Sequence, residues 1–438
     1  MENKLKFFLL FTLLLASKGF AQDFNVDLDL RPRFDYRHGF HSLVPSGVEP
    51  AALIEQRSRI KFGYASDKFK AHLSIQDVSV WGDTRQILPT DDNNSLQIAD
   101  AWVSFQIDEK WSTKVGRQAL SYDDQRILGG LDWAMQGRFH DAALVSYASG
   151  KSKLDLAFSF SQSSGSANPG NEFGNVYDVT GFFSYKALEM LHYNVKPSDK
   201  VSISILAMNN TFQNVEAGVP VEGFFHRQTL GTHSKFKLGS VNLAFNGYYQ
   251  TGKANATTDL SAYLVGLEAM GKVGKTKLGL GYELQSGTDQ NTTDNKIESF
   301  FPLYGTNHKF NGYMDYFYVG NHANSVGLSD LYAKAVFKTG EKSSFLAKVH
   351  YFGAAATLID PADGSDADAY LGTEIDLVYT QKLLPFATLK IGYSQMLASD
   401  SMEILKGQIG TASGLQNWGW AMLVVKPNLF KWKATPKE

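Results

Sequence analysis

The sequence contains no cysteine among its 438 residues. That absence excludes disulfides, thiolate chemistry and a lipid-modified cysteine. The ten histidines show neither an HExxH motif nor close paired spacing, so we predict no metal site and no cofactor. A formal net charge of −2 argues against a nucleic-acid partner. Beyond residue 21 no run of about 18 apolar residues occurs, which excludes a helical membrane span.

The amino-terminal stretch MENKLKFFLLFTLLLASKGFAQ has the layout of a secretory signal peptide. Two lysines precede an apolar run from Phe7 to Ala16, and small residues follow at Gly19 and Ala21. We therefore predict that residues 1–21 are cleaved and that the protein leaves the cytoplasm. No linker, charge block or composition shift divides the remainder, so residues 22–438 are expected to form a single domain.

Apolar and polar residues alternate through most of the chain. In VDLDLRPRFDYR, residues 26–37, every odd position is charged and the even positions between them are apolar or aromatic. A strand sends successive side chains to opposite faces, so this segment has one charged face and one apolar face. Eighteen strands are predicted in this way, over residues 24–37, 54–66, 68–81, 95–107, 111–120, 139–148, 152–162, 178–194, 199–212, 222–238, 240–252, 258–272, 275–287, 328–339, 343–355, 369–381, 386–398 and 417–428.

The connections between these strands alternate long and short, and this segregation indicates a barrel that spans an outer membrane. Such barrels have short periplasmic turns and long external loops, whereas a β-sandwich has no reason to sort its loops by length. An even number of strands closes the sheet, as hydrocarbon requires. The predicted fold class is therefore an all-β, transmembrane antiparallel β-barrel of 18 strands. A barrel of this size can hold an aqueous lumen.

Arginine is concentrated near the amino terminus, because nine of the ten arginines lie between positions 31 and 138. Those of the first two strands share one parity, and an arginine at the lipid-facing midplane costs roughly 2–4 kcal/mol, so they are expected to line the lumen. Guanidinium groups stay charged and bind carboxylates in a bidentate manner, which favours anionic solutes. The predicted pore-lining residues are Arg31, Arg33, Arg37, Arg57, Arg59 and Lys61, together with the isolated Arg227.

A second interpretation of these arginines is purely structural. They would then form ion pairs across the barrel and give it rigidity. Both interpretations can hold together, because a paired arginine still leaves a local positive field. The expected charge partners are Asp27, Asp29, Asp35, Asp100, Glu374 and Asp376.

Two of the predicted long loops have unusual composition. Residues 127–138 break the strand alternation, and Leu128, Leu131, Ala134 and Met135 fit a short helix. We expect the loop at about 121–138 to fold inward and narrow the channel; the alternative is an ordered external cap. The external loop at about 288–327 is rich in phenylalanine and tyrosine. These rings could bind sugars, but the preferred interpretation is that they pack the loop over the barrel mouth or against lipopolysaccharide.

Five segments resemble the alginate export family of outer-membrane barrels: EQRSRIKFGY, AHLSIQDVSVWGDT, IADAWVSF, KVGRQALSYDDQRILGGLDWAMQGRFHDAALV and the carboxy-terminal NWGWAMLVVKPNLF. The likeness covers about residues 25–148 and the last strand. It implies a monomeric pore of eighteen strands that carries an anionic polyuronate outward through a positively charged constriction. By motif match, the constriction residues are Arg59, Arg117, Arg126 and Arg138, with Asp124 and Asp141 as their partners.

The predicted function is an outer-membrane channel of a Gram-negative bacterium for export or diffusion of an anionic polysaccharide. The alternatives are a porin for uptake of small anionic nutrients or oligosaccharides, and a plugged structural or adhesive barrel. An enzyme is not expected, because Ser202, Ser204 and Ser344 have no histidine at matching height. The expected partners are outer-membrane lipid, lipopolysaccharide, the polysaccharide itself and periplasmic export proteins.

Overall fold

The computed structural model describes residues 22–83, 96–162 and 184–434, and the predicted signal peptide lies outside them. Within these ranges no helix is long and apolar enough to cross a bilayer. The elements are β1 (Asp23–His38), β2 (Ala51–Ala65), β3 (Phe69–Val80), β4 (Gln97–Gln106), β5 (Trp111–Gln118), β6 (His140–Ser149), β7 (Ser152–Phe160), β8 (Ala187–Ser198), β9 (Val201–Glu216), β10 (Val219–Leu238), β11 (Val241–Lys253), β12 (Asp259–Val273), β13 (Thr276–Gln285), β14 (Lys296–Ile297), η1 (Asn307–Lys309), β15 (Leu328–Lys338), β16 (Ser343–Gly353), β17 (Tyr370–Leu384), β18 (Ala387–Ala398), α2 (Asp400–Lys406), β19 (Gln416–Val425) and β20 (Asn428–Lys433).

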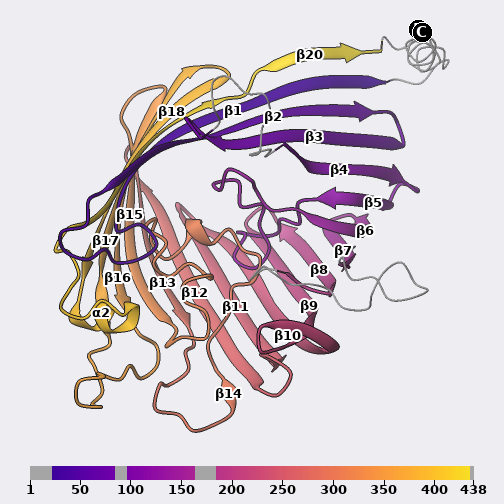
Figure 1. Ribbon diagram of the computed structural model, residues 1–438. Helices are drawn as coiled ribbons and strands as arrows, with labels where there is room; N and C mark the ends of the chain where they lie inside the picture. The colour runs from indigo at the N-terminus through magenta and orange to yellow at the C-terminus, as the bar shows by residue number, and fades with distance from the viewer. Residues whose placement is uncertain (1–21, 84–95, 163–183, 435–438) are drawn as a thin grey trace, which may run out of the picture.

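Eighteen antiparallel strands form one closed barrel, which confirms the predicted fold class. Each long strand pairs with its neighbours in sequence, and β1 pairs with both β2 and β19, so no edge is left between the first and last strands. Two short strands add to this cylinder. β14 forms a brief parallel pair with β12, and β20 prolongs β19 along the first residues of β1. Figure 1 shows the strands curving around a central space into which loops enter from one end.

Side chains alternate between the interior of the barrel and its outer surface. In β1 the odd positions from Asp29 to Asp35 are buried, whereas Phe34 is exposed. In β12, Leu264 is buried while Tyr263 and Val265 are exposed. The outer surface is therefore apolar on all sides, as lipid requires. The interior is charged near β1 and apolar at Leu260, Ala262 and Leu264 of β12, so it is not uniformly polar.

The two rims differ as predicted, with one exception. Short turns follow β2, β4, β6 and each even-numbered strand through β12, and then β15 and β17; we name this end the short-turn rim and the other end the long-loop rim. The exception is the long loop expected at 213–221. The structure has a tight turn at Ala217 and Gly218, whose φ angles of 50° and 80° fit a hairpin turn, so β9 and β10 extend beyond the barrel. The strand expected at 178–194 begins at Ala187, and residues 178–183 lie outside the described ranges.

Two loops from the long-loop rim pack inside the barrel: residues 119–139, named here the inward loop, and residues 286–327, named the aromatic loop. Leu128 of the first and Leu303 of the second join buried strand residues such as Leu188 in one apolar cluster. A second cluster places Tyr316 beside Trp418 and Met402 of α2. The aromatic loop therefore packs within the barrel and also against the other long loops at this rim, where the Tyr316 hydroxyl group donates to the Gly39 carbonyl oxygen and Lys406 of α2 donates to the Tyr316 carbonyl oxygen. Apolar side chains face inward near this rim, and the aromatic residues of the loop bury them away from water.

Candidate functional site

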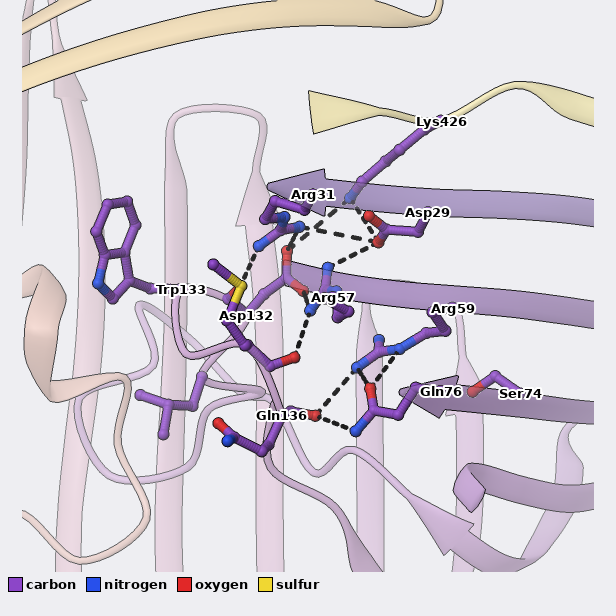
Figure 2. A network of polar contacts seen from close by, with 12 residues as sticks. Asp29, Arg31, Arg57, Arg59, Ser74, Gln76, Asp132, Trp133, Gln136 and Lys426 are labelled. Atoms are coloured by element: carbon purple, nitrogen blue, oxygen red, sulfur yellow. Dashed lines mark hydrogen bonds and ion pairs between the residues drawn. The ribbon is translucent and has the colours of Figure 1, made fainter. Parts of the chain in front are cut away.

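Arginines of β1 and β2 face the interior and hold the inward loop; Figure 2 shows Arg31, Arg57 and Arg59 directed toward it. Asp132 of that loop lies between two of them. One carboxylate oxygen is 3.0 Å from Arg31 Nη2, and the other is 3.0 Å from Arg57 Nη1. Arg31 also donates to the Asp132 carbonyl oxygen at 2.5 Å. Because both carboxylate oxygens are used, the loop is fixed in position and in orientation.

The neighbouring arginines hold the same loop through its backbone. Arg59 donates to the Gln136 carbonyl oxygen at 3.0 Å, and Gln76 donates to that oxygen at the same distance. The guanidinium of Arg33 lies 4.7 Å from the centre of the Trp133 ring, a cation–π contact. Arg33 is also paired with Asp35 at 2.8 Å. The inward loop is therefore attached to β1, β2 and β3 along most of its second half.

The inward loop contains turns rather than the short helix that the sequence predicts at 127–138. Its residues 119–139 are irregular throughout, and Leu131 has a left-handed φ of 46°. A left-handed residue ends any right-handed helix, because the next backbone hydrogen bond cannot form. The backbone carbonyls that a helix would use are thus free to accept from Arg31, Arg33 and Arg59. The arginines take the place of the helical hydrogen bonds.

Cations outnumber acids on this side of the lumen. Asp29 is the main acid, and it lies 2.7 Å from Arg57, 3.3 Å from Lys426 and 4.0 Å from Lys61. The cations that β1, β2 and the β18–β20 side present to the lumen are together named the arginine wall: Arg31, Arg33, Arg37, Arg57, Arg59, Lys61, Lys390 and Lys426. The acids that contact these cations are Asp29, Asp35, Glu55 and Asp132.

The pKa of Asp132 shows how strong the local positive field is. Partial burial raises the pKa of this carboxyl group, but Arg31 and Arg57 outweigh burial and hold it below its usual value. The Asp132 side chain nevertheless keeps 63% of its surface exposed. It is an ionised, accessible carboxylate bound by two guanidinium groups. A carboxylate carried by a solute could bind the same groups in its place.

Arg126 and Arg138 also lie inside the barrel, but they join the two loops to each other. Arg126 is almost fully buried and donates to Glu283 of β13 at 2.5 Å and to Asn311 of the aromatic loop at 2.8 Å. Arg138 donates to the carbonyl oxygen of Gly305 at 2.9 Å. Both arginines are thus structural connections between loops and barrel, in agreement with the second interpretation of the sequence.

Two predicted residues are not part of the lumen, and this is a correction. Gln118 and His140 face the interior, so the adjacent Arg117 and Asp141 face outward near the long-loop rim. There they form a bidentate pair with each other, at 3.0 and 2.9 Å. The motif match identified the two residues but did not show which face of the sheet their side chains occupy at the end of each strand. Pairing at the rim removes the cost of a lone charge beside lipid.

Arg227 does face the interior, where it lies between aromatic rings. Its guanidinium carbon is 5.5 Å from the ring centre of Phe212 and 5.1 Å from that of Phe301. The remaining arginine, Arg85, lies outside the described residues.

The expected charge partners divide into two groups. Asp29 and Asp35 pair with arginines as expected. Among the residues that the structure describes, the other expected partners that face inward form no ion pair with an arginine, although Asp124 accepts a hydrogen bond from the backbone amide of Arg126 at 3.1 Å. Their partners are Asn25 and Asn428 for Asp27, His72 and Ser74 for Asp100, Asn246 for Asp124, the Met314 amide for Glu374, and Ser394 for Asp376.

Sequence reasoning missed three acids that matter. Glu55 binds Arg33 at 2.6 Å, and its parity with Arg57 in the same strand could have identified it. Asp132 and Glu283 are the other two. Their contacts depend on how a loop folds inside the barrel, which no alternation pattern predicts. Across residues 22–83, 96–162 and 184–434, no group of His, Asp and Glu could hold a metal ion.

Residues 22–412 match the family described as alginate export. No curated protein matches this chain. Similar solved structures include OccAB4 of Acinetobacter baumannii, with a TM-score of 0.62 and 12% identity over 94% of this chain and 98% of that one. OccK3 (OpdO) of Pseudomonas aeruginosa has a TM-score of 0.60 and 11% identity over 93% and 96%. The outer membrane protein opdK of the same organism has a TM-score of 0.60 and 10% identity over 94% and 100%. At such identities the likeness concerns the fold.

Proposed function

This chain belongs to the alginate export family and is an outer-membrane channel, and from that premise we propose that it conducts an anionic polysaccharide of the polyuronate type. The observation that carries the proposal is the arginine wall, where cations outnumber the acids that contact them. Each carboxylate of a polyuronate can bind there through two parallel hydrogen bonds. Neutral sugars gain no such contact.

The mechanism is exchange of carboxylates along the wall. Arg31 and Arg57 are already bound to Asp132, so a solute carboxylate competes with an internal one rather than filling an empty site. Competition of this kind weakens each contact and shortens its lifetime. Conduction needs binding that is strong enough for entry and weak enough for exit, spread over several positions. Alternating cations on β1 and β2 provide those positions.

A second candidate function is uptake of small anionic nutrients or oligosaccharides. Its support is the packing of two loops inside the barrel, because the apolar clusters that they form narrow the passage. The two candidates differ in the length of solute that can pass. Current block by oligouronates of increasing length separates them: a polymer exporter keeps binding longer chains, whereas a small-solute porin excludes them.

We also propose that the protein works as a monomer surrounded by outer-membrane lipid and lipopolysaccharide, and that residues 1–21 direct its export. A barrel that closes within one chain supports the first point. Both are tested by the mass of the detergent-solubilised protein and by the amino-terminal sequence of the mature form. A second protein that meets the channel at its periplasmic rim would be found by cross-linking in cells.

The central test is ion selectivity in planar bilayers under a salt gradient. In the triple variant Arg31→Gln, Arg57→Gln and Arg59→Gln, the reversal potential should shift strongly toward cation preference. The matched control is Arg117→Gln, which removes one arginine from the outer surface and should leave selectivity unchanged. Selectivity that is equal in the wild type and the triple variant would refute the proposal.

A further inference from the structure

A cavity of about 420 Å³ lies inside the barrel, along the inner face of β10 to β16 and away from β1 and β2. Phe310 and Asp124 of the two inner loops line it on one side. Lys235, Val336 and Leu346 line it near the ends of their strands at the short-turn rim. The volume is within the usual range of about 300–1,000 Å³ for small-molecule sites. The cavity therefore lies beneath the loops, on the short-turn side.

The acids that line this cavity all have partners within the protein. Glu268 is bound by Lys334 and by the Tyr332 hydroxyl group. The other acids of the cavity are also paired. Their partners are His192 and Ser204 for Asp123, Asn246 for Asp124, Arg126 for Glu283, and His350 for Asp330. The carboxylates of the cavity are thus held in place by protein groups.

The lysines of the cavity differ in whether their ammonium groups have a hydrogen-bond acceptor. Lys334 is bound to Glu268, and Lys309 donates to the Asp124 carbonyl oxygen at 2.8 Å. Lys348 is only 7% exposed, yet it has no hydrogen bond or ion pair with any described residue. Its ammonium group lies 4.6 Å from the ring centre of Tyr332 and 5.7 Å from that of Tyr313. The ammonium group is attracted by Asp330 and Asp376 but forms no hydrogen bond with them, and it faces the cavity. An acceptor that enters the cavity would give it the hydrogen bond that the described residues do not supply.

We propose that this cavity binds one carboxylate-bearing sugar unit, with its carboxylate on Lys348. The inference rests on the proposed function and adds a discrete binding site to it. Lys235, which lines the cavity and is likewise unpaired among the described residues, provides a second donor. The rings of Tyr313 and Tyr332 give a flat apolar surface for the sugar.

The charge of the cavity decides which anion it binds. Its lysines and Arg126 are balanced by the acids that line it, so the site is close to neutral before a ligand enters. A single carboxylate is favoured there, whereas a dianionic phosphate would be repelled by the nearby acids. Those acids, Glu268 and Asp330 among them, can accept hydrogen bonds from sugar hydroxyl groups. A monoanionic sugar acid fits all of these features.

The test is block of single-channel current by sodium glucuronate added on the short-turn side, with glucose as the neutral probe. Lys348→Met keeps the length of the side chain and removes its charge, and we expect the dissociation constant for glucuronate to rise about tenfold. Lys348→Arg should retain binding within about threefold. Lys275→Met, at an exposed turn, is the matched control and should bind as the wild type does. Unchanged block in Lys348→Met, or equal block by glucose, would overturn the site.

The same recordings separate this inference from the proposed function. If ion selectivity depends on the arginine wall but glucuronate block is unaffected by Lys348→Met, the cavity is not a binding site and the channel proposal stands. If selectivity does not depend on the arginines but Lys348→Met weakens block, the cavity stands and the arginine wall does not select the solute. Retained binding in Lys348→Arg shows that this variant is folded, and a single-channel conductance of Lys348→Met equal to that of the wild type, without glucuronate, shows the same for the test variant.

Discussion

Trp133 of the inward loop is stacked on His308 of the aromatic loop, with ring centres 4.4 Å apart and ring planes inclined by 10°. His308 is in turn bound to Asp315 at 2.9 Å, and Arg33 contacts the same indole. The arginine wall, the inward loop and the aromatic loop are therefore linked through one tryptophan. A change at any of the three should affect how wide the passage is.

Removing the indole should widen the passage. In Trp133→Ala the stacking with His308 and the contact with Arg33 are both lost, and an aromatic pair is worth about 0.5–1.5 kcal/mol beyond its buried area. We expect larger single-channel conductance and more frequent current fluctuations in planar bilayers. The control is Trp111→Ala, which removes a partly exposed tryptophan beside the turn at the short-turn rim. Identical conductance in the Trp133 variant and the wild type would show that this contact does not limit the passage.

Neutralising Asp132 should make the channel more selective for anions. Asp132→Asn removes one negative charge from between Arg31 and Arg57 while nearly preserving the shape of the side chain. The two guanidinium groups then have Asp29 as their remaining carboxylate partner. The reversal potential under a salt gradient reports the change. Asp141→Asn on the outer surface is the matched control and should have no effect; a shift toward cations in the Asp132 variant would contradict the competition mechanism.

The same carboxyl group predicts how selectivity depends on pH. The arginines hold the pKa of Asp132 in the folded protein below its ordinary value of 3.8. The stabilisation by this ion pair is therefore complete above that value and is lost as the pH falls below it. Anion selectivity should accordingly stay constant between pH 8 and 5. If selectivity changes with pH within that range in wild-type channels but not in Asp132→Asn, Asp132 is not the permanently ionised group described here.

The fold was predictable from the sequence because it depends on local patterns. Alternation in VDLDLRPRFDYR places Asp29 and Arg31 inside and Phe34 outside, and the structure agrees. Loop lengths gave the orientation of the two rims. The hairpin at Ala217 was missed because long strands can continue past the membrane without a change in alternation.

The candidate site was predictable only in its strand half. The parity of Arg57 and Arg59 follows from the pleat of β2. The partners contributed by loops do not follow from any pattern, since Asp132 and Arg31 are 101 residues apart in sequence. Lys348 was missed for another reason. Its significance lies in the lack of an acceptor, which only the packed interior reveals.

Lys406 of α2 provides a test of how the last long loop is held. It donates to the carbonyl oxygens of Tyr316 at 2.6 Å and Asn321 at 3.1 Å, and burial lowers its pKa to about 8. A lowered lysine pKa means that the packed loop binds fewer protons than the released loop between pH 8 and 10.5. Packing should therefore strengthen as the pH rises through that window. Cleavage near α2 by proteinase K, corrected for the activity of the enzyme at each pH, should slow; in Lys406→Met it should show no such trend.

The pair formed by Arg126 and Glu283 should behave as a buried ion pair, with strong coupling between its members. Removal of one partner, in Arg126→Met or Glu283→Gln, leaves the other charge buried and should destabilise the protein by about 3–5 kcal/mol. The double variant should be less destabilised than the sum of the two single variants, with a coupling energy of about 0.5–3 kcal/mol. Reversible unfolding in urea from lipid vesicles gives the free energies of unfolding. The exposed pair Arg117 and Asp141 is the control cycle, and its coupling should be at most about 1 kcal/mol. Additive losses at Arg126 and Glu283 would mean that the two side chains do not stabilise the protein as an ion pair.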